Sequence, residues 1–279
     1  MPELAEVEFG RRVAEARTRG RRIAEAVADD DPIVFDEASP KEVRDALVGA
    51  TVGSVERHGK QLWFALADER PAVLVHFGMT GGFRTPDDAP IQLENSPAEV
   101  DRSWPPRFCK LRLVLDDGGE LAFTNARRLG RVRLRKDPRA QPPVSRLGYD
   151  PLLELPTAAE FAARVGRRRV TLKGLLLDQK FAAGVGNWIA DEVLYQARLD
   201  PRRRANELSP DELDRVRRTL RAVVEQAVAV DARKDHFPAD WLFHRRWGKG
   251  EGRTTLEGEP IEFLTVAGRT TAWVPARQG

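Results

Sequence analysis

The second and third residues of the chain, Pro2 and Glu3, place a secondary amine beside a carboxylate once Met1 is removed, which the small second residue permits. An α-amino group with a pKa near ~8 keeps an appreciable neutral fraction at pH 7. A neutral amine can attack a carbon electrophile to form an iminium, with Glu3 as the adjacent acid or base. The commoner use of these residues is structural: a proline that starts a helix, followed by an acid that complements the helix dipole.

A glycine turn, Gly184-Val185-Gly186-Asn187, lies between the helix-forming segments LKGLLLDQK and WIADEVLYQARL. The first backbone N–H groups of the second helix form an anion site, and we expect Asn187 to cap that helix. Lys173 and the run Arg167-Arg168-Arg169 lie just upstream, so a phosphate backbone is the expected ligand. The alternative is a tight helical hairpin whose glycines only permit close packing.

Two loops that follow strand-like segments carry further candidates. Residues 125–131 gather arginines beside a glycine turn, and an apolar member of such a loop can insert between bases. A solvated arginine face is the alternative interpretation. Residues 76–82 hold Met79, one of two methionines, and a methionine by itself is more typical of core packing. Lys60, after His58-Gly59, is on the simplest interpretation an exposed cation at a strand end.

The elements that must position these residues begin with a helix from Pro2 and a second helix from the capping box of Ser39 and Glu42. Strand-like segments then dominate, separated by Gly, Pro and Asp turns, which is typical of a β-sandwich or barrel. These segments are 51–57, 60–67, 72–77, 111–115, 120–124 and 131–135. The proline-rich, acidic stretch 85–106 is expected to be a long surface loop.

The composition changes after Lys136. We expect a β-sandwich domain at 1–136, a linker at 137–147, a helical domain at 148–244 and a hairpin at 245–279. Capping boxes at 157–160 and 209–212 begin two of the helices. The strand-like segments PIEFLTV and RTTAWV flank Ala267-Gly268 as a β-hairpin.

The composition also excludes several classes of protein. Among 279 residues, one cysteine, Cys109, and four unclustered histidines exclude a disulfide framework and a multi-cysteine zinc site. The 46 basic and 43 acidic residues leave a net charge of +3, so the total charge alone does not indicate a nucleic-acid partner. No apolar run approaches the roughly 20 residues that span a bilayer, and the first residues do not form a secretory signal. We expect a cytoplasmic protein without a membrane partner.

Taken together, the motifs resemble the formamidopyrimidine-DNA glycosylase / endonuclease VIII family. MPELAEVE resembles the family's MPELPEVE, HGKQLWFAL its lysine strand, VHFGMTGGF its HLGMSG loop and NARRLG its DPRRFG loop. LKGLLLDQKFAAGVGNWIADEVLY matches its helix-two-turn-helix signature. The motifs follow the family's order over nearly the whole chain. The resemblance implies an α+β multidomain fold: an N-terminal β-sandwich with an N-terminal helix, a helix-two-turn-helix module and a C-terminal hairpin finger.

The resemblance further implies a bifunctional DNA glycosylase and AP lyase that excises oxidised bases through a Schiff base at Pro2 and cleaves the strand by β/δ-elimination. It implies that Met79, Arg127 and Leu129 fill the void left by the extruded nucleotide. The implied catalytic residues are Pro2, Glu3, Lys60 and Arg269, with Glu6 in support, and the implied DNA-binding residues are His76, Met79, Arg127, Leu129, Arg169, Lys173 and Asn187. The expected partner is damaged DNA, duplex or single-stranded, bound by a nucleoid-associated monomer.

Two departures from the family's pattern stand out. The four cysteines of its zinc finger are replaced, so we expect no zinc and no other cofactor, and packing within the hairpin must replace the metal's contribution to folding. The replacing residues are Thr254, Glu257, Val274 and Arg277, and the packing residues are Ile261, Phe263, Val266 and Trp273. In addition, Leu129 replaces a phenylalanine and Phe108 a histidine, which leaves the lesion and the opposite base open.

Three questions stay open at the level of sequence. Residues 236–250 match no family motif, and either line the lesion pocket or pack under the hairpin. A noncatalytic damage-specific or structure-specific DNA-binding protein on the same scaffold is an alternative, although it has no need of an N-terminal amine. An RNA-binding module is a third, because helix-two-turn-helix elements also occur in ribosomal proteins.

Overall fold

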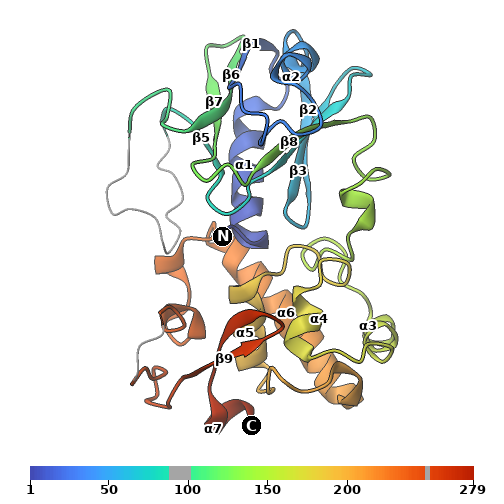
Figure 1. Ribbon diagram of the computed structural model, residues 1–279, viewed down its shortest axis with the longest axis vertical. Helices are drawn as coiled ribbons and strands as arrows, with labels where there is room; N and C mark the ends of the chain where they lie inside the picture. Colours follow the sequence, from blue (N-terminus) through green and yellow to red (C-terminus); the bar gives the residue numbers. More distant parts are fainter. Residues whose placement is uncertain (88–101, 249–251) are drawn as a thin grey trace. The chain divides into compact units, whose positions relative to one another are not determined.

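The computed structural model describes residues 1–87, 102–248 and 252–279 (Figure 1). The chain forms two compact units, Met1–Arg146 and Leu147–Gly279. Most of the surface loop expected at 85–106 lies outside the described residues.

The first unit is a sandwich of two antiparallel four-stranded sheets, with the strand orders β1-β6-β7-β5 and β2-β3-β4-β8. All six strands expected from the sequence are present, and the prediction of a β-sandwich is confirmed. The strands are β1 (Ile23–Ala28), β2 (Val52–His58), β3 (Gln61–Leu66), β4 (Ala72–His76), β5 (Gly82–Arg84), β6 (Cys109–Leu115), β7 (Glu120–Thr124) and β8 (Arg131–Arg135). The sequence did not predict β1, in which three of six residues are alanine, or β5, which has three residues.

Two helices complete the core of this unit. Helix α1 (Leu4–Thr18) runs alongside the strands and contacts both sheets (Figure 1). It buries Leu4, Val7 and Ala14, as predicted. Helix α2 (Pro40–Leu47) begins at the expected capping box, where the Glu42 N–H donates to the Ser39 hydroxyl at 3.2 Å. Apolar side chains of both sheets and both helices meet in one buried cluster, which fixes the start of α1 against the sandwich.

The second unit is helical and ends in a hairpin. Both predicted capping boxes are confirmed, because they begin α3 and α6. The hairpin is also confirmed: Ala267 and Gly268 adopt φ values of 51° and 70° in a two-residue turn. The elements are α3 (Ala158–Val165), α4 (Leu172–Leu177), α5 (Asn187–Gln196), α6 (Pro210–Ala229), β9 (Glu262–Val266), β10 (Arg269–Trp273) and α7 (Pro275–Gln278). Within the described ranges, no helix combines the length and apolarity that crossing a membrane requires.

The segment after α6, which matched no family motif, packs against α5 and under the hairpin. Phe237, Trp241 and Phe243 surround Trp188 of α5, with ring centroids 5.2–6.4 Å from the Trp188 ring. Leu242 is buried in a cluster with residues of the hairpin strands and of their flanks. Residues 236–250 were expected either to line the lesion pocket or to pack under the hairpin. The described part of this segment, 236–248, fits the second alternative.

Candidate active site

The amino end of α1 carries the first group of candidate residues. Pro2 and Glu3 are buried, whereas Met1 is 44% exposed. The backbone N–H of Glu3 donates to the Glu6 carboxylate at 2.9 Å. Burial, followed by the negative charge of Glu3, raises the pKa of Glu6 to about 7. A carboxyl group that binds or releases a proton near neutral pH therefore lies directly beside the Pro2-Glu3 pair.

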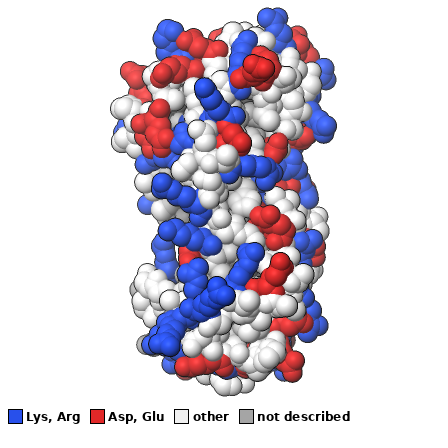
Figure 2. All heavy atoms as spheres, turned by 90° about the vertical axis from the view of Figure 1, so that its right-hand side faces the viewer, with Lys and Arg blue, Asp and Glu red and all other residues white. Residues whose placement is uncertain are grey.

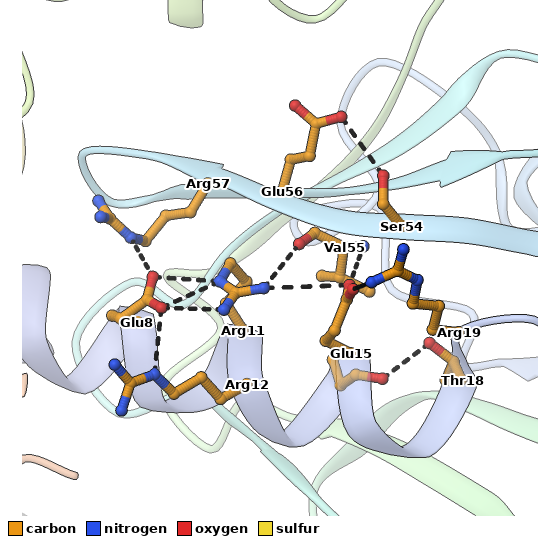
Figure 3. A network of polar contacts seen from close by, with 11 residues as sticks. Glu8, Arg11, Arg12, Glu15, Thr18, Arg19, Ser54, Val55, Glu56 and Arg57 are labelled. Carbon is orange, nitrogen blue, oxygen red and sulfur yellow. Dashed lines mark hydrogen bonds and ion pairs between the residues drawn. The ribbon is translucent and has the colours of Figure 1, made fainter. Parts of the chain in front are cut away.

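A partly buried ionic network joins α1 to β2 (Figure 3). Glu8 of α1 accepts hydrogen bonds from Arg11, at 3.0 Å, and from Arg57 of β2, at 2.9 Å. Arg57 also donates to the carbonyl of Gly59 at 3.0 Å, and Arg11 donates to the carbonyl of Val55 at 3.1 Å. Burial opposes ionisation of Glu8, but the hydrogen bond from Arg11 and the charge of Arg57 lower its pKa overall. Sequence reasoning missed this network, because nothing in the local pattern pairs residues 8 and 57.

His76 lies next to Lys60 because Gln61 of β3 pairs with His76 of β4. The backbone N–H of Gly78 donates to Nδ1 of His76 at 3.1 Å. Burial, with the charge of Lys60 as the next cause, lowers the pKa of His76 to about 4. The imidazole is therefore neutral at pH 7. Because Nδ1 accepts a hydrogen bond, the ring proton lies on Nε2, where it can be donated to an anion such as phosphate.

The two loops predicted to insert into DNA expose their apolar side chains. Met79 is 36% exposed and Leu129 42% exposed, in contrast to the core position that is usual for a methionine. Arg127 is also exposed. The loops lie against each other, because an ideal Cβ on Gly78 would be 2.4 Å from the carbonyl carbon of Leu129. The structure therefore brings together the three residues expected to fill the void.

Four further arginines follow Arg127 within residues 127–135, and their contacts limit the charge that they can present to DNA. Each of them forms an ion pair with an acidic residue of the loop that precedes α2, so much of its charge is compensated within the unit. Arg128 pairs with Asp31 at 2.8 Å, Arg131 and Arg133 pair with Asp36, and Arg133 and Arg135 pair with Glu37. The run of positive charge in the sequence is thus a poor guide to the charge available to DNA.

Two expectations for the glycine turn of the second unit are wrong. Gly186, not Asn187, is the N-cap of α5, and the Asn187 amide instead donates to the carbonyl of Thr270 at 2.9 Å. Lys173 is completely buried, and its ammonium pairs with Asp191 at 2.6 Å. A buried ammonium that is already paired does not present its charge to a phosphate, so Lys173 is a structural cation in this conformation.

The carboxylate of Asp191 connects the hairpin to α4 and α5, a role that the sequence did not suggest. Its carboxylate binds Lys173 and Arg246, and it accepts from the backbone N–H of Ala272 in β10 at 3.2 Å. Lys173 also donates to the hydroxyl of Thr271 at 2.7 Å. These bonds tie β10, whose first residue is the exposed Arg269, to α4 and α5. Arg269 and Asn187 are thus held close to each other through the adjacent Thr270.

Exposed cations of the second unit provide a surface for anions. Figure 2 shows Lys and Arg side chains crowded together over part of one face. Arg164, Arg167, Arg168 and Lys180 line a hollow of about 350 Å³ beside Phe181. Arg169, the remaining residue of the predicted phosphate-binding run, is exposed. Such a group of guanidinium and ammonium ions suits the phosphates of a polynucleotide.

The four positions that replace the family's cysteines do not fit a zinc ion. Val274 offers no ligand atom, and Arg277 is a cation that pairs with Glu257 at 3.4 Å and with Glu259 at 2.9 Å. Arg277 also donates to the Tyr195 hydroxyl at 2.6 Å. Among the residues that the structure describes, no three His, Cys, Asp or Glu side chains are grouped as metal ligands would be. An ionic cluster thus includes Glu257 and Arg277, two of the four positions that the resemblance assigns to the family's cysteines.

The chain matches the models of one glycosylase family over nearly its whole length. Residues 1–132 match the formamidopyrimidine-DNA glycosylase N-terminal domain, residues 147–238 the H2TH domain of the same glycosylase and residues 241–275 the formamidopyrimidine-DNA glycosylase-like C-terminal domain. The formamidopyrimidine-DNA glycosylase of Arabidopsis thaliana is 41% identical over 278 residues, which cover 100% of this chain and 71% of that protein. That of Thermus thermophilus is 36% identical and covers 100% of this chain and 99% of its own.

Two solved structures of formamidopyrimidine-DNA glycosylases share the fold of this chain. The crystal structure of the Thermus thermophilus protein has a TM-score of 0.74 at 35% identity, covering 100% of this chain and 99% of that chain. The Lactococcus lactis glycosylase, bound to DNA containing an AP site, has a TM-score of 0.79 at 24% identity, covering 99% of both chains. Because the Lactococcus lactis protein is only 24% identical, its similarity shows the fold alone.

Proposed function

The chain belongs to the formamidopyrimidine-DNA glycosylase family, and we propose that Pro2, freed by removal of Met1, is the nucleophile with which it excises oxidised bases. The protein is a DNA repair glycosylase with the AP lyase activity typical of its family. The observation that carries the proposal for Pro2 is the start of α1, where Glu6 holds the Glu3 N–H at 2.9 Å and has a pKa of about 7. An amine with acids beside it is suited both to base excision and to cleavage of the strand.

In the first step, the Pro2 nitrogen forms a bond to C1′ of the damaged nucleotide and the glycosidic C1′–N bond breaks, so that the base leaves with a proton. Glu3 gives a proton to the ring oxygen O4′, and the opened sugar is held as an iminium. The iminium acidifies C2′, and loss of a C2′ proton expels the 3′ phosphate. A second elimination expels the 5′ phosphate, and water then hydrolyses the iminium to return the Pro2 amine.

The remaining side chains bind and reshape the DNA. A base inside a duplex is unreachable, so it must be flipped out, at a cost of a few kcal/mol that is lowest for damaged bases. Met79, Arg127 and Leu129 fill the space that it leaves. Lys60 and the Nε2–H of His76 bind phosphate in the first unit, and Arg169, Asn187 and Arg269 do so in the second. Lys173 does not bind phosphate itself but supports the hairpin that carries Arg269.

We also propose that duplex DNA is the preferred form of the substrate and that the protein acts on it as a monomer at the nucleoid. The exposed Met79 and Leu129 support duplex DNA, because an apolar wedge has a role only where a base leaves a stack. Excision rates on duplex and single-stranded oligonucleotides with the same lesion test this preference, and light scattering of the complex tests the monomer.

Borohydride trapping tests the nucleophile. The protein is incubated with duplexes containing an oxidised purine, an oxidised pyrimidine or an abasic site, and the iminium is reduced to a stable adduct. The wild-type protein, shown by mass spectrometry to begin at Pro2, should give an adduct whose modified peptide starts at Pro2. A variant with an uncleaved N-terminal extension keeps every side chain but blocks the amine, and should give none.

Two variants complete this experiment. Pro2→Gly together with Glu3→Gln should abolish the adduct, whereas Lys60→Met should leave trapping detectable and weaken DNA binding. An adduct that survives the N-terminal extension, or one located at a lysine, would exclude Pro2 as the nucleophile.

A further inference from the structure

Asn125, at the end of β7, joins two loops of the first unit through its side chain. Its side chain is completely buried. The Nδ2 group donates to the carbonyl of Phe77 at 2.8 Å, and Oδ1 accepts from the backbone N–H of Gly130 at 3.0 Å. Phe77 precedes the loop that exposes Met79, and Gly130 follows the loop that exposes Leu129. One amide group thus bonds to the backbone of both loops that carry the wedge residues.

The backbones of these two loops are in direct contact, with no space for a side chain at Gly78 or Gly130. Gly78 has φ +63°, and an ideal Cβ there would lie 2.4 Å from the carbonyl carbon of Leu129. An ideal Cβ on Gly130 would lie 2.7 Å from Nδ2 of Asn125 and 2.9 Å from the carbonyl oxygen of His76. Since Gly78 lies directly against the backbone of Leu129 and the Asn125 amide bonds to both loops, the hydrogen bonds of the amide decide how the loops are aligned.

Removal of the Asn125 amide would leave the backbone N–H of Gly130 without its partner, whereas the carbonyl of Phe77 would keep the hydrogen bond from Gly81 N–H, at 2.9 Å, within its own loop. Burying an unsatisfied polar group is unfavourable, so the loops would separate to admit water rather than keep their spacing. The exposed side chains of Met79 and Leu129 would then move independently. Each would lose part of the preorganisation that makes insertion into a base stack favourable.

We propose that Asn125 is a positioning residue that holds the Met79 and Leu129 loops in fixed register, so that the two side chains enter DNA as one rigid wedge. The proposal rests on the proposed function of these side chains. Asparagine suits the position because it offers a donor and an acceptor at once. A carboxylate there would still accept from Gly130 but would direct an oxygen at the carbonyl of Phe77.

The test compares two substrates that differ in their need for a wedge. Asn125→Ala and Asn125→Asp are assayed under single-turnover conditions on a duplex with an oxidised base and on a single strand with an abasic site. We expect Asn125→Ala to slow duplex excision about tenfold, the effect of leaving one buried N–H, that of Gly130, without a partner, while the rate on the abasic strand changes less than about twofold. Asn125→Asp keeps the acceptor for Gly130 but places an oxygen against the carbonyl of Phe77, and it should also slow duplex excision without slowing the abasic strand.

Thr18→Val is the matched control. Thr18 is also completely buried, and its hydroxyl donates to the Ala14 carbonyl at 2.7 Å near the carboxyl end of α1. This variant should lose comparable stability without changing the ratio of the two rates. If Asn125→Ala slows both substrates equally, or neither, the positioning role is wrong.

A fluorescence measurement separates this inference from the proposed function. 2-Aminopurine, placed opposite an abasic analogue in a duplex, reports on stacking in the space that the wedge fills. Binding of the wild type should change its fluorescence, and Asn125→Ala at saturation should give less than half of that change. An unchanged signal would overturn the role of Asn125 even in an active enzyme. A wild type that neither excises nor traps would instead overturn the proposed function.

Discussion

Arg57 and Glu8 form an ion pair inside the first unit, with Arg57 Nε 2.9 Å from Glu8 Oε2 and both side chains at least nine-tenths buried. The same guanidinium donates to the carbonyl of Gly59, the residue before Lys60. Glu8 lies about one and a half turns of helix beyond Glu3 on α1. The pair therefore connects the helix that starts at the proposed nucleophile with the turn that carries the proposed phosphate-binding lysine.

Arg57→Ala should lower the free energy of unfolding by about 2 kcal/mol, because Glu8 loses its most deeply buried partner and keeps only the more exposed Arg11 and Arg12. Urea denaturation measures this loss. Lys41→Ala breaks an equally direct but exposed pair with Asp45, at 2.6 Å, and serves as the control. It should cost less than about 1 kcal/mol. Similar losses for both variants would mean that burial does not strengthen the Arg57–Glu8 pair.

Glu6 should make the protein less stable as the pH rises. Burial, and then the charge of Glu3, raises its folded-state pKa to about 7 from an ordinary value of 4.5. The folded state then binds the proton more tightly than the unfolded state, so this contribution is complete below pH 4.5 and is lost as the pH rises through 7. Unfolding free energies measured between pH 5 and pH 8 should fall more steeply for the wild type than for Glu6→Gln. Equal slopes would contradict the raised pKa.

His76 should remain neutral down to about pH 5, because burial and the charge of Lys60 lower its pKa to about 4 from 6.5. Its depressed pKa contributes stability that is complete above pH 6.5 and is lost as the pH falls through 4. Long-range ¹H–¹⁵N NMR spectra should show the Nε2–H tautomer at pH 7, because Gly78 donates to Nδ1. Signals of the exposed His236 provide an internal comparison. An Nδ1–H tautomer would rule out the assigned hydrogen bond.

Arg169 and Lys173 should differ in how they affect DNA binding. Arg169 is exposed, so Arg169→Ala should reduce the slope of log K against log salt by about 0.9, the value for one lost phosphate contact on duplex DNA. Lys173→Met should leave this slope unchanged, because its ammonium is bound to Asp191, and should instead speed amide exchange in β10. A reduced slope for Lys173→Met would restore the direct phosphate contact expected from the resemblance.

Metal chelation should have no effect on this protein. Arg277 pairs with Glu257 and Glu259, and Val274 offers no ligand atom, so we expect EDTA treatment to change neither the melting temperature nor the excision rate. Arg277→Ala should lower the melting temperature by several degrees, about 1–2 kcal/mol, through loss of these pairs and of the Tyr195 contact. Elemental analysis that finds one zinc per chain would contradict the expectation.

Much of the fold could be predicted because its signals are local. Capping boxes at Ser39, Thr157 and Ser209 each begin a helix, since side chain and backbone satisfy each other within four residues. The Ala267-Gly268 turn closes a hairpin for the same reason. The candidate site was less predictable. Lys173 has the appearance of a phosphate ligand in the sequence, yet its partner Asp191 lies 18 residues away and on another helix.

The sequence by itself determined the residue types that can do the chemistry, Pro2, Glu3 and Lys60, and the order of the motifs, because these depend on identity and spacing along the chain. The tertiary structure decided which charges remain available to DNA. Arg131 and Arg133 are compensated by acids about 95 residues away, Arg127 is left exposed, and Asn125 is placed between two loops. Desolvation and pairing depend on which segments meet in space, and that is determined only when the whole core is packed.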